Sequence, residues 1–367
     1  MTLSVLRRGP APRPPAAASA TLFAWPLLAT LAALLAATLL AAQFGPVAIS
    51  AADWTAPWRA TNDDGGAHAM SGSAHVLWQI RLPRVIFALL VGAALALAGS
   101  LTQALFRNPL ADPGLLGVTT GAACAAALTL VIFASAAAPL PSAWRPWVLP
   151  AAAFCGALLV CFALDRLARW LTPGAIAGLL LTGLAINAVT AAVIGLATYL
   201  ATDEQLRSLS FWTLGSLAGA GWPLVATMAV LLAVLVPFAR RLARPLNALA
   251  LGEAAASHVG IAVPRLRGWV VLLVALSCGA AVAWCGVIGF LGLLAPHLAR
   301  ACVGADLRRQ LPFSMLLGGA LLLLGDTLAR TLAAPAEIPV GIFTALIGGP
   351  AFLLMLRAAV RQQGGSV

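Results

Sequence analysis

Residues 83–105, PRVIFALLVGAALALAGSLTQAL, form an apolar stretch long enough to cross a lipid bilayer as one helix. A membrane-spanning helix needs about 20 such residues. Comparable stretches recur along the whole chain of 367 residues, which is 62% hydrophobic and only 9% charged. Soluble domains carry about 25% charged residues. We therefore predict an all-α membrane protein of about ten transmembrane helices.

The other nine predicted spans follow from the same pattern of apolar stretches separated by polar segments. They are 22–43, 114–136, 147–169, 175–199, 222–240, 268–286, 289–302, 312–330 and 339–360. The segment 203–217 is predicted to be a short re-entrant or surface helix. Residues 1–20, rich in Arg, Pro and Ala, are expected to form a disordered cytoplasmic tail, and residues 21–367 a single transmembrane domain.

The distribution of arginine predicts the orientation in the membrane. The net charge is +11, and all 22 basic residues are Arg. With the N-terminus inside, six arginines fall on the outer side and the remaining 16 on the cytoplasmic side, where basic residues accumulate. The outer six are Arg59, Arg81, Arg84, Arg145, Arg207 and Arg330. Ten helices then place both termini in the cytoplasm.

The absence of lysine excludes an ATP-binding site of the common phosphate-loop type, since GxxxxGK[ST] requires that residue. Any ATP that drives this protein must be hydrolysed by a separate chain, and we predict no enzymatic activity. The arginines lie between apolar segments rather than on one patch, so nucleic acid is not an expected partner.

The cysteines and histidines do not form a recognisable metal site. The six cysteines lie in or at the ends of apolar segments without a CxxC pair, so we interpret them as packing residues and predict no metal. His68, Met70 and His75 fall in the outer loop. His and Met are haem ligand types, but a solvated loop with scattered histidines is the simpler interpretation.

An internal repeat relates two parts of the chain. GAALALAG at 92–99 aligns with GAAVAWCG at 279–286, and Asn108-Pro109 and Ala295-Pro296 follow at matching distances. We expect both copies to run toward the cytoplasm. Repeats of this kind commonly flank a substrate path in transporters. Helix breaks are predicted at Asn108, Pro109, Pro296 and His297, because proline cannot donate to the helical ladder. His297 is expected to hydrogen-bond at a helix end.

Several longer motifs occur in an order that resembles the permease subunits of iron–siderophore, haem and vitamin B12 ABC importers, also called type II importers. The resemblance covers the chain from about residue 75. The motifs are RLPR (81–84), GAALALAGSLTQALFRNPLADPGLLGV (92–118), LGEAAASHVGI (251–261), GFLGLLAPHLAR (289–300), GDTLAR (325–330) and EIPVGIFTALIGGPAF (337–352).

The resemblance implies a permease in the inner membrane of a bacterium, embedded in the lipid bilayer. It implies pairing with a second copy of the chain, two cytoplasmic ATPase subunits and a periplasmic substrate-binding protein. No permanently bound cofactor is expected, since ATP is used by the partner subunit. The transported ligand would be haem (hemin) or another iron chelate.

The resemblance also assigns residues to three roles. For docking of the binding protein it implies Arg81, Arg84 and Arg330. For coupling to the ATPase, within the loop 244–267, it implies Leu251, Gly252, Glu253, His258 and Gly260. For the translocation path it implies Thr182, Asn187, Gly341, Gly348 and Gly349. The alternatives are interfacial snorkelling of the arginines, an ordinary surface helix, and close helix packing at the glycines.

The substrate and the transport class have their own alternatives. The segments FRNPLADPGLLGV and LRSLSFWTLGSL look most like haem permeases, with ferric siderophore or vitamin B12 permeases of the same family as the alternative. An ion-coupled secondary transporter is disfavoured because the acidic residues fall at or near helix ends rather than at mid-membrane. An intramembrane enzyme is disfavoured because no paired Asp, Ser/His or HExxH arrangement occurs inside a predicted helix.

Overall fold

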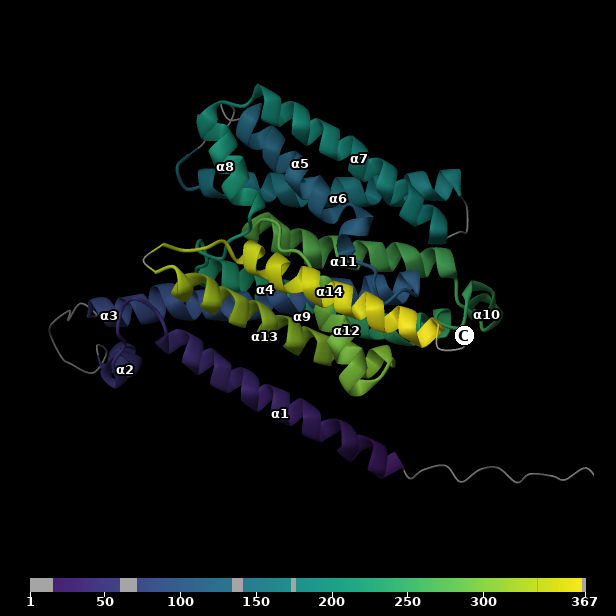
Figure 1. Cartoon of the computed structure of the whole chain (residues 1–367), viewed down its shortest axis with the longest axis horizontal. Helices are drawn as coiled ribbons and strands as arrows, with labels where there is room; N and C mark the ends of the chain where they lie inside the picture. Colours follow the sequence, from purple (N-terminus) through teal and green to yellow (C-terminus); the bar gives the residue numbers. More distant parts are fainter. Residues whose placement is uncertain (1–15, 60–70, 134–140, 173–175, 335, 365–367) are drawn as a thin grey trace, which may run out of the picture.

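The computed structural model describes residues 16–59, 71–133, 141–172, 176–334 and 336–364, and in these residues it is all-helical (Figure 1). The elements are α1 (Ala16–Gln43), α2 (Ala51–Arg59), α3 (Gly72–His75), the π-helix η1 (Val76–Arg81), α4 (Leu82–Phe106), the 3₁₀-helix η2 (Pro113–Leu116), α5 (Val118–Val131), α6 (Arg145–Leu171), α7 (Ile176–Leu200), α8 (Asp203–Thr213), α9 (Trp222–Leu249), α10 (Glu253–His258), α11 (Val263–Cys285), α12 (Leu291–Val303), α13 (Leu307–Leu332) and α14 (Val340–Gly364).

The ten predicted membrane helices are confirmed as helices. Within the described residues, seven helices are long and apolar enough to cross a bilayer. The three remaining predicted spans correspond to shorter apolar helices at Leu28–Gln43, Val118–Val131 and Leu291–Val303. The segment predicted as a surface helix is α8. Most of the predicted 1–20 tail lies outside the described residues, but α1 begins at Ala16, so residues 16–20 are helical.

The bundle has two distinct ends (Figure 1). The α3 end carries α2, α3 and α8, and the α10 end carries α10, the start of α1 and the C-terminus. A hydrogen bond from Trp222 Nε1 to the carbonyl of Trp78 (2.9 Å) places the start of α9 at the α3 end. Both ends of the described chain therefore lie at the same end of the bundle as α10.

Helix α4 is the centre of the bundle and packs against α13, α11, α12 and α9. Its backbone touches two partner backbones directly. A Cβ atom added at Gly92 would collide with the carbonyl of Gly318 in α13, and one added at Gly99 would collide with the carbonyl of Gly292 in α12. Small residues at helix crossings allow such close approach. The glycines of the first repeat copy therefore set the spacing of the inner helices.

The two repeat copies run in opposite directions, so the expectation that both run toward the cytoplasm is wrong. The first copy lies in α4, which begins at the α3 end. The second lies in α11, which follows α10 and ends beside α8, where Ser216 N donates to the carbonyl of Cys285 (2.7 Å). Gly99 is in mid-helix, whereas Gly286 caps α11 with a φ of 71°. The repeat is thus of the inverted kind found in many transporters.

The predicted helix break at Asn108 and Pro109 is confirmed, whereas the one predicted at Pro296 and His297 is wrong. Helix α4 ends at Phe106, directly before Arg107 (φ 52°), and Asn108 and Pro109 follow the helix. By contrast, Pro296 and His297 lie inside α12, which continues to Val303. Gln310 Nε2 donates to the carbonyl of Pro296 (3.1 Å), and Gln103 Nε2 donates to that of Leu293 (3.1 Å). Side chains of α13 and α4 thus support the α12 backbone around the proline.

Replacing Gly99 by Ala should destabilise the bundle, because the new methyl group has no space against the carbonyl of Gly292. Overpacking of this kind typically costs about 1–3 kcal/mol. Thermal unfolding of the purified protein in detergent measures the effect. Gly195→Ala is the matched control, since a Cβ at Gly195 in α7 meets nothing within 4 Å. Equal melting temperatures for the two variants would contradict the close α4–α12 contact.

Candidate functional site

The three arginines predicted for docking lie together at the α3 end, but they are buried and bound within the chain. Arg84 donates to Asp326 at 2.9 Å and to Glu337 at 2.8 Å. Arg81 donates to the carbonyls of Ala42 (3.1 Å), Gln43 (2.9 Å) and Val47 (2.5 Å). The three arginines share one end of the bundle, but none of them presents an exposed guanidinium group.

The C-terminal end of α1 supplies acceptors for two of the three arginines. Arg330 donates to the carbonyls of Ala41 and Phe44, which lie in or directly after the last turn of α1. The last four carbonyls of a helix lack intrahelical partners and carry partial negative charge. Arg81 and Arg330 therefore cap α1 and hold it against α4 and α13.

A second polar cluster at the α3 end was not anticipated from the sequence. Asp53 of α2 accepts hydrogen bonds from Ser50 N and Oγ (both 2.7 Å), Ser71 Oγ (2.9 Å) and Ser73 Oγ (2.8 Å). These bonds, those of Ser50 first, lower the pKa of Asp53 to about 2. The cluster joins α2 to α3. His75 is exposed at the end of α3, and His68 and Met70 lie outside the described residues.

At the α10 end, the predicted coupling residues form one compact element. Gly252 (φ 116°) and Gly260 (φ 83°) flank α10, and positive φ at both positions favours glycine. Ala256 is fully buried, which anchors the short helix, while Leu251 is 81% exposed. His258 Nδ1 is 2.7 Å from the carbonyl of Ala254. Leu251, which precedes Gly252 and α10, is thus exposed beside a short helix that is anchored to the bundle.

One cavity lies between α10 and the long helices behind it, and a second adjoins it between α6 and α7. A cavity of about 390 Å³ is lined by residues of α6, α7, α10 and α11, among them Glu253, Ser257 and Arg267. Arg267 is buried and pairs with Asp165 of α6 (3.2 Å), which also binds Arg169. Arg169 lines both this cavity and a larger one of about 700 Å³ between α6 and α7.

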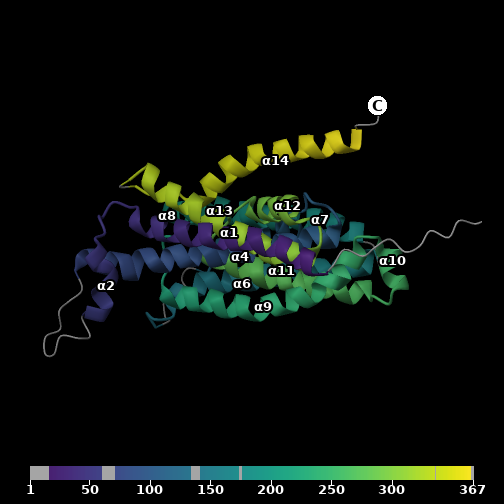
Figure 2. The same cartoon turned by 90° about the horizontal axis from the view of Figure 1, so that it is seen from below.

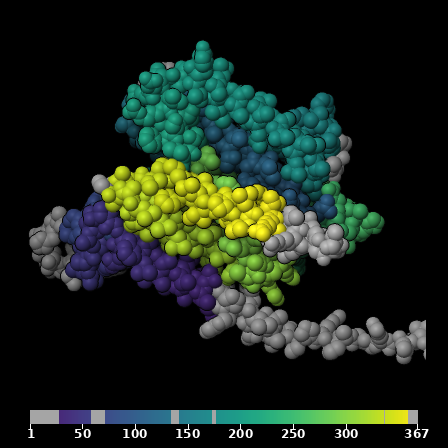
Figure 3. All heavy atoms as spheres, in the orientation of Figure 1, coloured from purple at the N-terminus to yellow at the C-terminus, as the bar shows by residue number. Residues whose placement is uncertain are grey.

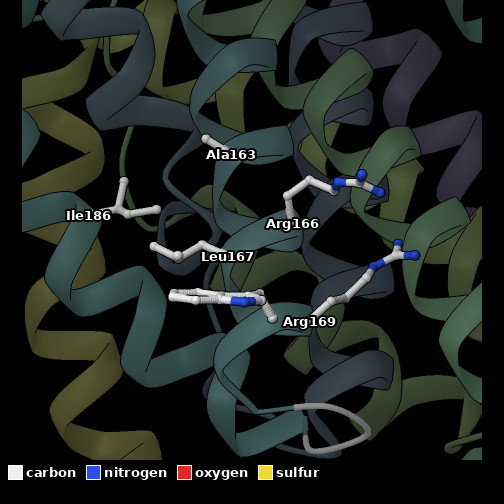
Figure 4. A pocket seen from close by; sticks show the side chains of 6 residues that line it. Ala163, Arg166, Leu167, Arg169 and Ile186 are labelled. Carbon is white, nitrogen blue, oxygen red and sulfur yellow. The ribbon is translucent and has the colours of Figure 1, made fainter.

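The larger cavity combines apolar walls with positive charge. Ala163, Leu167, Trp170 and Ile186 line it together with Arg166 and Arg169. Figure 4 shows the guanidinium groups of Arg166 and Arg169 extending to the same side, away from Ile186. Ligand-binding sites are usually apolar and carry a few polar groups that orient the ligand. The apolar wall and the guanidinium group of Arg166 suit an apolar ligand that carries a carboxylate, whereas Arg169 is already bound by Asp165.

Most of the residues predicted to line a translocation path lie in contacts between helices of this chain. Thr182 is buried in the chain, and Asn187 holds α7 to its neighbours by accepting from Thr120 Oγ1 (2.6 Å) and donating to the carbonyl of Gly114 (3.3 Å). Gly341 packs on the carbonyl of Leu214 and Gly348 on Phe290, whereas Gly349 faces open space. Close packing therefore explains the first two glycines.

The helices that could line a path, α7 and α14, were predicted from the sequence, but the residues on their exposed faces were not. The outward face of α7 carries small and apolar residues, including Ala185, Ala188, Ala192 and Leu196. In Figure 3, α14 lies across the middle of the visible face of the molecule, and the surface is hollowed between α14 and helices α5–α8. Ala185, Ala188 and Ala192 are three and four residues apart, a spacing that places them on one face of a helix and that is visible in the sequence alone.

No metal-binding arrangement is found among the described residues, in which no group of three or more His, Cys, Asp or Glu side chains could hold an ion. All six cysteines are free thiols, and Cys161, Cys278 and Cys285 are buried in the helix interfaces. His297 lies inside α12, where its Nδ1 is buried without a hydrogen-bond partner, so the expected bond at a helix end is not formed.

The fold and these sites define a polytopic α-helical membrane transport protein. Residues 22–358 match the model of the FecCD transport family. The chain is 46% identical over 293 residues to the hemin transport system permease protein HmuU of Yersinia pestis, covering 79% of this chain and 86% of that protein. It is 41% identical to the vitamin B12 import system permease protein BtuC of Pectobacterium atrosepticum, covering 76% and 82% of the two chains.

A solved structure supports the same assignment. It is described as an inward-facing metal-chelate type ABC transporter, and it superposes with a TM-score of 0.75 at 31% identity, covering 90% of this chain and 98% of its own. The chain belongs to the FecCD transport family. It is a multi-pass membrane permease subunit of an ABC importer, whose ATPase is a separate chain.

The two carboxylates bound by Arg84 should contribute unequally to stability. Asp326 is 1% exposed and Glu337 is 47% exposed. Asp326→Asn should destabilise the protein by about 3 kcal/mol, because breaking a buried pair leaves an uncompensated charge. Glu337→Gln should cost about 1 kcal/mol or less, as solvent screens that contact. Denaturation of both variants in detergent compares them, and equal losses would contradict a buried Arg84–Asp326 pair.

Proposed function

We propose that this permease imports haem. The observation that carries the proposal is the order of similarity, with 46% identity to a hemin permease and 41% to a vitamin B12 permease over similar lengths. The cavity between α6 and α7 supports it, because Arg166 lies beside apolar walls and can pair with a propionate carboxylate of haem, whereas Arg169 is already bound by Asp165.

The proposed assembly contains two copies of this chain, two ATPase subunits and a periplasmic binding protein in the inner membrane of a bacterium. The second copy would cover α7 and α14, since the membrane-spanning windows of these helices are only 22% and 11% buried within one chain. The α10 end would face the cytoplasm, following the excess of arginine on that side, and the α3 end the periplasm.

In this assembly α10 would contact the ATPase and pass its movement to α6 and α11. The short helix rests on buried Ala256, and Glu253 and Ser257 share a cavity with Arg169 and Arg267. These arginines bind Asp165, which joins α6 to α11. Docking of the binding protein by Arg81, Arg84 and Arg330 stays a prediction, and it requires at least some of their contacts within the chain to open.

ATP-dependent uptake by proteoliposomes tests the substrate. The permease is reconstituted with its cognate ATPase and binding protein, and uptake of haem, cyanocobalamin and a ferric siderophore is measured with and without ATP. We expect uptake of haem that depends on ATP and on the binding protein. Uptake of cobalamin or of the ferric siderophore in place of haem would contradict the proposed substrate.

Reversing the charge of Glu253 should uncouple transport from ATP hydrolysis, because this residue belongs to the proposed ATPase contact. In the same proteoliposomes, Glu253→Arg should reduce ATP-driven uptake at least about tenfold while the permease remains folded, consistent with the loss of an interface contact worth about 1.4 kcal/mol or more. Glu204→Arg is the matched control, since Glu204 is exposed on α8 at the opposite end. Normal uptake by the Glu253 variant would rule out this role.

A further inference from the structure

A pocket outside the sites described above is lined entirely by arginines. Arg240, Arg241 and Arg244 of α9 and Arg308 of α13 surround a cavity of about 430 Å³. This volume falls within the range of about 300–1,000 Å³ usual for ligand sites. Guanidinium groups stay charged in proteins, so the four cannot relieve their mutual repulsion by losing protons.

The arrangement is fixed by a polar contact between the two helices. Asn247, one turn after Arg244, donates from Nδ2 to Asp306 Oδ1 (2.6 Å) and accepts from Leu307 N through its Oδ1 (3.0 Å). Asp306 caps the start of α13 and pairs with Arg308 (2.8 Å). Asn247 therefore brings the first turn of α13, with Arg308, beside the arginines of α9.

The positive charge of the pocket is only partly compensated within the chain. Asp306 carries the neighbouring negative charge, and hydrogen bonds, that of Arg308 first, lower its pKa to about 2. Arg241 lies over the ring of Phe238, 5.6 Å from its centroid. In the described part of the chain, neither Arg240 nor Arg244 forms an ion pair. Four guanidinium groups thus face one nearby carboxylate.

The pocket lies where an exposed apolar stripe of α9 ends. Residues 222–239 contain no charged side chain, and Arg240 follows directly. Val230, Val234 and Phe238 are 64%, 52% and 47% exposed at a spacing of four residues, so they share one face of the helix. Arg241 continues this face. Figure 2 shows α9 and α14 on opposite edges of the bundle, so a copy of the chain seated on α14 would leave α9 open.

We propose that this pocket binds the headgroup of an anionic phospholipid whose acyl chain lies along Val230, Val234 and Phe238. Guanidinium groups bind phosphate through paired hydrogen bonds, and basic pockets between membrane helices bind headgroups with several phosphates. Four arginines against one carboxylate favour a lipid with two phosphodiesters, such as cardiolipin, over one with a single phosphate.

The apolar stripe favours a lipid over an acidic protein surface as the occupant. The exposed residues that lead into the pocket are those of a membrane-spanning segment, where the surroundings are acyl chains. A protein partner at the α10 end would meet the arginines without covering this stripe. The α10 helix, the proposed ATPase contact, is a separate element that follows α9 in the chain.

Native mass spectrometry of the purified full-length chain in detergent tests the proposal. Cardiolipin, phosphatidylglycerol and phosphatidylcholine are added separately, and the variant Arg240→Gln/Arg244→Gln is compared with the wild type. From the contribution expected of each basic residue near a membrane surface, the variant should bind cardiolipin about 30-fold more weakly. Arg207→Gln/Arg265→Gln is the matched control, because it removes two exposed arginines outside the pocket and should bind normally.

Two further measurements keep the test decisive. If the double variant does not fold, Arg308→Gln replaces it, since that side chain is largely exposed and lines the same pocket. Binding of the ATPase subunit is measured for each variant. Equal affinity of the wild type for cardiolipin and phosphatidylcholine, or unchanged cardiolipin binding by the pocket variants, would overturn the proposal. Loss of ATPase binding with cardiolipin binding retained would assign the pocket to the ATPase.

Discussion

The direct contact of backbones at Gly92 and Gly99 of α4 is the constraint on which the rest of the bundle depends. No side chain separates these glycines from the carbonyls of Gly318 and Gly292. In a bilayer, helices associate through close packing and polar contacts, because the lipid is as apolar as the helix surface. The tight crossings place α12 and α13 on α4 and thereby bring Asp326 to Arg84 and Gln310 to α12.

Much of the fold could be predicted from the sequence, because apolar length alone identifies a membrane span. The opposite direction of the second repeat copy did follow from the predicted spans, because 83–105 is the second and 268–286 the seventh, and the expectation of a common direction was inconsistent with that count. The position of Pro296 within α12 was missed for a different reason. A proline ends a helix when nothing else supports the backbone, and here Gln103 and Gln310 from other helices provide that support.

The candidate site was less predictable, because its contacts join distant parts of the chain. The motif RLPR correctly located Arg81 and Arg84 at one end of the bundle, but their acceptors lie in α1, α13 and the segment before α14. A polar residue in a membrane helix indicates an interior position. It does not distinguish a path from a helix interface, and Asn187 belongs to an interface with η2 and α5.

Arginine serves two different purposes in this bundle, and the available acceptors decide which. At the α3 end, the last carbonyls of α1 and two carboxylates surround Arg81, Arg84 and Arg330, so these guanidinium groups are buried as links between helices. At the α10 end, Arg240 and Arg244 find no such acceptors in the described chain. Guanidinium groups keep their charge, and Arg240 and Arg244 are exposed, so the counter-charge that we propose for them lies outside the chain. A membrane protein placed among anionic lipids has that source beside it.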